Sequence, residues 1–407
     1  MGMNAPEAVR AAVDAAFREE WGQVVATLIG LTGNWDLAED CAQDAFAAAL
    51  ATWGRDGVPA RPGAWLTTTA RHRATDRLRR DATGAAKLRQ LAVLERAPTE
   101  SLAEEIPDER LRLIFTCCHP ALPFPARVAL TLRTLTGLST GEIAKAFLTA
   151  EPTMAQRLVR AKRKIVEAGI PYRVPPAELL PQRLTAVLAV LYLIFNQGYD
   201  EEDGRRALAA EGIHLARTLV RLTPTEPEAR GLLALMLLLE ARRANRIDDG
   251  VLIPLEDQDR SRWDRALIAE GLTTLDEALA VRRCGPYQVQ AAIAACHATA
   301  PDAAATDWPQ IAALYAALTR MAPSPVVELN RAVAVAMADG IPAGLALVDE
   351  LAESGELDGY YLLPATRADL LRRDGRLAEA ATFYEEALRL APTDAERRYL
   401  TGRLSKL

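Results

Sequence analysis

The polar side chains best suited to binding a partner lie close together between residues 151 and 165. They are Gln156, Arg157, Arg160, Lys162, Arg163 and Lys164. Amides and cations of this kind bind phosphates and the edges of bases. Met154, Leu158, Ala161 and Ile165 recur between them at helical spacing, which predicts an amphipathic helix with a basic outer face. The expected chemistry is nucleic-acid binding, and the alternative is a basic solvated helix in an ordinary helical domain.

A shorter helix is predicted just before the basic helix, and the shorter helix would position the basic one. Ser139 and Glu142 have the spacing of a capping box, in which each side chain satisfies a free backbone amide of the first turn. A break follows at residues 148–150, and Pro152 suits the first turn of the basic helix. Two short helices joined by a tight turn, with the second one basic, predict a helix-turn-helix that enters a major groove.

A second basic block lies earlier, in the segment PGAWLTTTARHRATDRLRR that begins at Pro62. Its arginines could track phosphates, while Trp65 and the threonines at 67–69 could hold unstacked bases. Core packing is the alternative for Trp65, and a solvated helix face is the alternative for the arginines. The presence of two basic units in one chain favours nucleic-acid binding.

The overall charge of −6 hides an asymmetry along the chain. Residues 1–170 carry 22 basic and 20 acidic residues, whereas residues 171–407 carry 26 and 34. Within the first part, basic blocks at 61–90 and 107–170 flank an acidic segment at 91–106. This pattern predicts two contacts with a polyanion in the first part and none in the acidic second part.

Several classes of protein are disfavoured by the sequence. A composition rich in alanine and leucine, with 5% aromatic residues, favours an all-α fold. No apolar stretch or signal core indicates a membrane or export, so we expect a cytoplasmic protein with reduced cysteines. No nucleophile, phosphate-loop or metal-ligand pattern is present, so we expect no catalysis, cofactor or metal. Cys117, Cys118 and His119 are better explained as a buried helix end than as metal ligands. Asp200–Asp203 is better explained as a solvated loop than as a cation site.

The C-terminal half has a recurring two-helix pattern. Its clearest unit ends at Pro392, with small residues at Ala368, Ala380 and Ala387, and with Gly375 in the turn. Small residues let paired helices approach closely, and Tyr384 would fill the groove between them. This pattern is typical of tetratricopeptide repeats, and weaker copies end at residues 224 and 323. Such repeats usually form scaffolds or binding surfaces.

The segments DLAEDCAQDAF, PGAWLTTTARHRATDRLRR and LSTGEIAKAF…RLVRAKRKI, in this order, resemble an extracytoplasmic-function sigma factor of bacterial RNA polymerase. RLIFTCCHPALP and LYLIFNQGY resemble the subgroup with a long tetratricopeptide-like C-terminal extension. The resemblance implies sigma domain 2 at 7–83, a linker at 84–106, sigma domain 4 at 107–170 and a helical-repeat regulatory domain at 182–407. It also implies an all-α fold, binding to core RNA polymerase (its clamp region and flap) and to promoter DNA, and no conventional anti-sigma partner.

The resemblance assigns functions to three sets of residues. The acidic helix from Asp36 would grip polymerase, and its alternative is a solvated acidic face; its residues are Asp36, Glu39, Asp40, Gln43 and Asp44. The arginine-rich helix would melt and read the −10 element through Trp65, Thr68, Arg71, Arg73, Arg77 and Arg80. The basic helix would bind the −35 element through Thr153, Gln156, Arg157, Arg160, Lys162 and Lys164. In the last set we expect Gln156 and Arg157 to read bases, and Arg160, Lys162 and Lys164 to hold phosphates.

Two other functions remain open from the sequence. A conventional helix-turn-helix regulator with a ligand-sensing helical domain would bind duplex DNA without polymerase. A tetratricopeptide adaptor would carry the basic helices without using them on DNA. For the sigma factor, the acidic extension is expected to modulate activity by contacting the sigma domains or polymerase.

Overall fold

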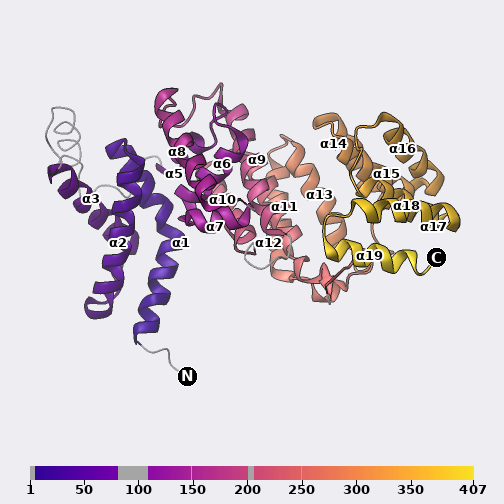
Figure 1. Ribbon diagram of the computed structural model, residues 1–407, viewed down its shortest axis with the longest axis horizontal. Coiled ribbons are helices and arrows are strands. Elements are labelled where there is room, and N and C mark those ends of the chain that lie inside the picture. The colour runs from indigo at the N-terminus through magenta and orange to yellow at the C-terminus, as the bar shows by residue number, and fades with distance from the viewer. Residues whose placement is uncertain (1–4, 81–108, 148, 200–205, 249) are drawn as a thin grey trace. The chain divides into compact units, whose positions relative to one another are not determined.

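The computed structural model describes residues 5–80, 109–147, 149–199, 206–248 and 250–407 (Figure 1). These residues are predominantly helical, so the all-α prediction is confirmed. The strands described are β1 (Ile247–Asp248) and β2 (Val251–Leu252), which pair antiparallel. The chain forms two compact units, Met1–Leu215 and Ala216–Leu407. The predicted linker at 84–106 and the acidic loop at 200–203 lie outside the described residues.

The first unit begins with three helices, α1 (Ala5–Thr32), α2 (Trp35–Asp56) and α3 (Pro62–Arg80). α1 and α3 both pack against α2 and against each other. The turn between α1 and α2 follows from local chemistry. Gly33 adopts a positive φ of 65°, and the side chain of Asn34 accepts a hydrogen bond from the amide of Leu37 at 3.1 Å. An N-cap of this kind satisfies an amide that the helix itself leaves free.

The rest of the first unit is also helical. They are α5 (Glu109–Cys117), α6 (Phe124–Thr131), the π-helical turn η1 (Leu132–Thr136), α7 (Thr140–Ala146), α8 (Glu151–Glu167), α9 (Leu180–Tyr199) and the first part of α10 (Arg206–Leu222). α6 packs against η1, α8 and α9. Cys117 and Cys118 are buried at the end of α5, beside Thr134 and Thr131. The predicted buried helix end is therefore confirmed.

The second unit is a succession of helices. It contains the end of α10, α11 (Pro227–Glu240), η2 (Arg243–Asn245), η3 (Arg260–Arg262), α12 (Arg265–Ala280), α13 (Pro286–Thr299), α14 (Trp308–Met321), α15 (Pro325–Asp339), α16 (Ile341–Ser354), α17 (Leu362–Arg373), α18 (Leu377–Leu390) and α19 (Asp394–Leu404). Many of these helices have a proline in the first turn, where its missing N–H costs nothing. Most of these helices pack against their sequence neighbours, and α11 also packs extensively against α13, as expected for a helical repeat.

The clearest repeat predicted from the sequence is the pair α17 and α18. Ala368, Ala380 and Ala387 are fully buried, and Tyr384 is 1% exposed. Gly375 lies in the turn with a φ of 81°, a conformation that side chains with a Cβ rarely adopt. The predicted roles of the small residues and the turn glycine in this pair are therefore confirmed. Among the described helices, none is long and apolar enough to cross a membrane.

Candidate nucleic-acid and polymerase interface

α8 exposes most of the residues predicted to bind the −35 element. Thr153, Gln156, Arg160 and Lys164 are exposed, and Arg157 is half-buried. The predicted apolar stripe is buried on the opposite face, at Met154, Leu158, Ala161 and Ile165. The basic face of α8 is therefore available along the length that a major groove would contact.

The local structure before α8 has the geometry of a helix-turn-helix. Glu142 donates its backbone amide to Ser139 Oγ at 3.2 Å, and Ser139 donates its own amide to Glu142 Oε2 at 2.7 Å. These two bonds complete the predicted capping box at the start of α7. α7 packs directly against α8, and Pro152 lies in the first turn of α8. The prediction of two helices joined by a short turn, the first with a capping box and the second with a first-turn proline, is confirmed.

Lys162 is the exception on α8, because it forms ion pairs inside the protein. Its Nζ lies 2.7 Å from Glu39 Oε1 and 2.8 Å from Asp36 Oδ1, and its side chain is 16% exposed. Both carboxylates belong to α2, the helix predicted to bind polymerase. In this conformation two carboxylates hold the Lys162 ammonium, so a contact with a DNA phosphate would compete with these ion pairs.

Glu39 is the centre of a buried charge cluster. Its side chain is 6% exposed, and its second oxygen lies 3.0 Å from Arg133 Nε. Arg133 comes from η1 and also donates from Nη1 to the carbonyl of Leu138 at 3.1 Å. One carboxylate thus binds two cations, Arg133 and Lys162, from the helix-turn-helix part of the unit. Burial strengthens these attractions, because the surrounding dielectric is low.

The other residues of α2 that are predicted to bind polymerase lie nearer the surface. Asp36, Asp40 and Gln43 are exposed, and Asp44 is half-buried. Asp40 and Asp44 both bind Arg77 of α3, at 3.0 and 2.7 Å from its two terminal nitrogens. These carboxylates therefore hold α3 in place, in addition to any role toward polymerase. Cys41 lies between Asp40 and Asp44 in the sequence. Burial raises the pKa of its thiol to about 11, so the thiol stays protonated at neutral pH.

α3 buries an alanine and leucine face and turns its arginines outward. Leu66, Ala70, Ala74 and Leu78 are buried. Of the residues predicted to bind the −10 element, Arg73 and Arg80 are exposed, and the half-buried ones are Trp65, Thr68, Arg71 and Arg77. Trp65 packs edge-to-face on the buried Trp53, with ring centroids 5.6 Å apart. Part of the Trp65 surface is therefore used in packing, as the alternative for this residue anticipated.

Residues outside these three sets complete the arrangement. They include Arg133, which pairs with Glu39, and Tyr172, whose hydroxyl donates to the carbonyl of Ala26 at 2.8 Å. Neither residue was among those predicted from the sequence. The signal for Arg133 is present in the sequence, since it is a single cation inside the apolar run VALTLRTLTGL. A lone charge in such a run indicates a buried partner. The Tyr172 contact has no comparable local signal.

Comparisons with known proteins place three parts of the chain in families. Residues 17–83 match sigma-70 region 2, residues 112–165 match sigma-70 region 4, and residues 183–279 match a family of unknown function, DUF6596. An uncharacterized protein of Rhizobium meliloti (strain 1021) is 42% identical over 406 residues. That alignment covers 97% of this chain and 96% of the relative. No solved structure matches the chain.

The two sigma-70 matches fall on the parts of the chain that carry the site. Region 2 includes α2 and α3, and region 4 includes the α7–α8 helix-turn-helix. Proteins with these regions are non-enzymatic transcription factors that bind core RNA polymerase and promoter DNA. The chain therefore belongs to the sigma-70 family, as a sigma factor of the extracytoplasmic-function type with an extra C-terminal domain.

Proposed function

We propose that α2 binds the clamp of core RNA polymerase and that α3 opens and reads the −10 element. In the same proposal, the region 4 part binds the flap, and its helix α8 reads the −35 element. The observation that carries this proposal is the exposed basic face of α8 on a capped helix-turn-helix within the region 4 match. The factor performs no chemistry in this scheme. Contacts with bases and phosphates supply the few kcal/mol needed to extrude a base.

The buried cluster at Glu39 adds a step to this scheme. Lys162 is paired with α2, so reaching a phosphate of the −35 element requires it to leave Glu39 and Asp36. The same separation would free Asp36 for polymerase. Binding of DNA would therefore favour binding of polymerase, and the reverse. DNA would draw Lys162 away from Asp36, and polymerase would draw Asp36 away from Lys162.

The C-terminal part is proposed to be a tetratricopeptide-like domain that modulates activity, without a conventional anti-sigma partner. The proposed divisions are 7–83, 84–106, 107–170 and 182–407. The family match that starts at residue 183 supports a separate C-terminal part. α9 nevertheless packs against α5 and α6 inside the first compact unit, so a functional truncation must keep it.

The division of α8 into reading and anchoring positions makes a testable prediction. Arg157→Ala should cost about 1–3 kcal/mol at the preferred −35 sequence and relax base preference there. Lys164→Ala should weaken all sequences alike and reduce the salt slope by about one. The measurement is initiation and promoter affinity for purified factor with core polymerase, across a promoter library and several salt concentrations.

Two outcomes would contradict this proposal. If Arg157→Ala and Lys164→Ala changed sequence preference and salt slope identically, the division of α8 would be wrong. Tight, sequence-specific duplex binding by the free protein, with no dependence on polymerase, would instead favour the conventional helix-turn-helix regulator. Lys145→Ala is a suitable control, because Lys145 is an exposed cation of α7 outside the predicted −35 set.

Modulation by the C-terminal domain is tested by truncation after Leu222, which retains α9 and α10. We expect promoter-specific transcription to change severalfold relative to the full chain, because an acidic domain would no longer contact sigma domains or polymerase. Circular dichroism and urea unfolding show whether the truncated chain is folded. A folded truncation with unchanged output and polymerase affinity would contradict modulation.

A further inference from the structure

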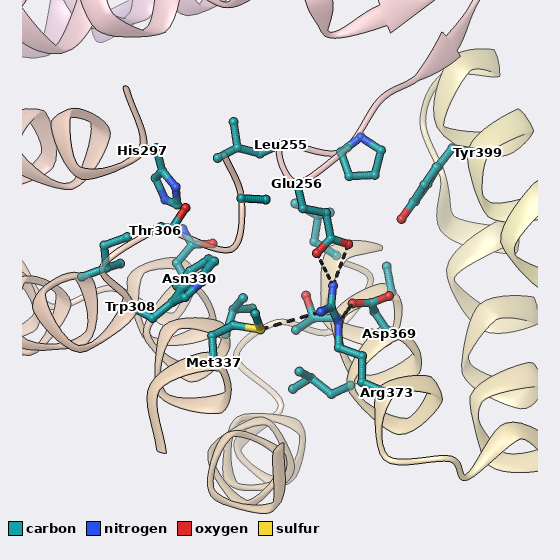
Figure 2. A pocket seen from close by; sticks show the side chains of 18 of the residues that line it. Leu255, Glu256, His297, Thr306, Trp308, Asn330, Met337, Asp369, Arg373 and Tyr399 are labelled. Carbon is teal, nitrogen blue, oxygen red and sulfur yellow. Dashed lines mark hydrogen bonds and ion pairs between the residues drawn. The ribbon is translucent and has the colours of Figure 1, made fainter. Parts of the chain in front are cut away.

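The second compact unit contains a cavity of about 380 Å³ (Figure 2). Its walls come from three stretches of sequence, the loop from Pro254 to Arg260, helices α13–α15, and helices α17–α19. Small-molecule pockets usually occupy about 300–1,000 Å³ and are mostly apolar with a few polar groups. The size of this cavity is therefore that of a compact ligand, and all of its walls lie within one unit.

Aromatic and aliphatic side chains form most of the lining. The aromatic ones are Trp308, Tyr315, Tyr384 and Tyr399. Trp308 packs edge-to-face on His297, with ring centroids 5.4 Å apart. Aliphatic side chains such as Leu255, Ile311 and Met337 complete the walls. A planar ring suits such walls, because aromatic groups stack or meet edge-to-face and gain more than their buried area alone provides.

The charged groups of the lining are already compensated by protein partners. Arg373 donates from Nη2 to both oxygens of Glu256 and from Nε to Asp369 Oδ2 at 2.7 Å. Arg260 is 6% exposed. It donates to the carbonyls of His297 and Ala300 at 2.9 and 2.8 Å, and to Thr306 Oγ1.

These carbonyls form the C-terminal end of α13, where the helix dipole favours a cation. His297 also lines the cavity, and its pKa falls to about 4 because of burial and the neighbouring Arg242 and Arg260. It is neutral at pH 7. In the described lining, Arg373 has carboxylate partners and Arg260 has three neutral acceptors, so a charged ligand would lose its hydration while competing with these partners.

Three polar side chains of the lining have capacity for hydrogen bonds. In the described part of the chain, the imidazole of His297, the amide of Asn330 and the hydroxyl of Thr366 have no side-chain hydrogen bond to protein. Figure 2 shows His297, Trp308 and Asn330 on one side of the cavity, opposite the Glu256–Arg373–Asp369 network. His297 and Asn330 thus lie on the same side of the cavity as Trp308, an aromatic ring that a ligand could pack against.

We propose that this cavity is a binding site for an uncharged aromatic small molecule that carries a hydrogen-bonding group. The C-terminal part would therefore bind a small molecule, which is a function beyond the proposed role in promoter recognition. Because three separate stretches of sequence form its walls, a bound ligand would stabilise the second unit by linking them.

The probe pair is 1-naphthol and 1-naphthoate, which share a ring system and differ in charge at pH 7. For the full chain we expect saturable one-to-one binding of 1-naphthol by calorimetry, a rise in unfolding temperature and quenching of tryptophan fluorescence. Binding of 1-naphthoate should be weaker by about tenfold or more. Equal or tighter binding of the carboxylate would overturn the ligand class, and no saturable binding of 1-naphthol at its solubility limit would overturn the site.

Two variants and one control locate the binding. Ala365→Phe places a ring in the cavity from α17, and Asn330→Leu removes an exposed hydrogen-bonding group at a similar size. Each should weaken 1-naphthol binding by about tenfold, and the exposed position of Asn330 keeps its variant folded if Ala365→Phe is not. Ala378→Phe adds the same ring on an exposed position of α18 outside the cavity and should bind like the wild type. Unchanged affinity in both cavity variants would overturn the assignment.

Discussion

Replacing Glu39 with alanine is expected to lower the free energy of unfolding by about 3 kcal/mol. The Glu39 side chain is 6% exposed and binds Arg133 and Lys162, which are 17% and 16% exposed. Without this carboxylate, two mostly buried cations lose their shared partner. Removing one member of a buried ion pair costs about 3–5 kcal/mol, because the charge that remains is poorly solvated. Urea unfolding of the full chain measures the change.

Asp36 provides the matched control for Glu39, because both carboxylates bind Lys162. The Asp36 side chain is 84% exposed. An exposed ion pair contributes less than about 1 kcal/mol, because water and salt screen it. Asp36→Ala should therefore leave the urea midpoint almost unchanged. If the two variants lost similar stability, the interaction at Glu39 would not be the buried charge cluster described above.

Gly22→Ala is expected to destabilise the first unit by about 1–3 kcal/mol, the usual cost of inserting a methyl group into a packed interface. Gly22 lies on α1 against η1, and a Cβ there would stand 2.8 Å from the carbonyl oxygen of Leu135. Backbone atoms cannot rotate away as a side chain does, so α1 and η1 would have to separate. Thermal and urea unfolding measure the loss.

Gly54→Ala is the control for this prediction, since Gly54 lies in α2 and a Cβ would meet only Val9 Cγ2 at 4.0 Å. Alanine is more favourable than glycine inside a helix by about 1 kcal/mol, so this variant should be as stable as the wild type or more stable. A loss of stability in both variants would point to a helix effect rather than to the close approach of Gly22. Equal stability of wild type and Gly22→Ala would contradict the tight contact of α1 with η1.

Both predictions concern one interface of the first unit. On one side are α1 and α2, and on the other side is the region 4 part. That contact contains Glu39, which the family resemblance assigns to polymerase binding, and Lys162, which it assigns to DNA. The assignments themselves stay predictions, as do those for the remaining residues of α2, α3 and α8. The structure adds a condition that applies to Lys162 in particular. Its ion pairs with Asp36 and Glu39 compete with any contact to a phosphate.

The local elements were predictable from the sequence, because their causes are local. The capping box of Ser139 and Glu142, the first-turn Pro152 and the apolar stripe of α8 act within a few residues of one another. The turn at Gly375 follows in the same way from one residue that tolerates a positive φ. The order of the acidic, arginine-rich and helix-turn-helix blocks then indicated the family, which the region 2 and region 4 matches bear out.

The contacts between distant segments were decided only by the tertiary structure. Nothing near Glu39 in the sequence distinguishes it from the exposed Asp40, yet it is buried against Arg133 and Lys162. The cavity likewise combines a loop near residue 256 with helices more than a hundred residues later. Hydrophobic periodicity shows which face of a helix is buried, but it does not name the helix that covers it. The sequence alone therefore determined the helices and the family, whereas packing decided which charges are paired and where a ligand could bind.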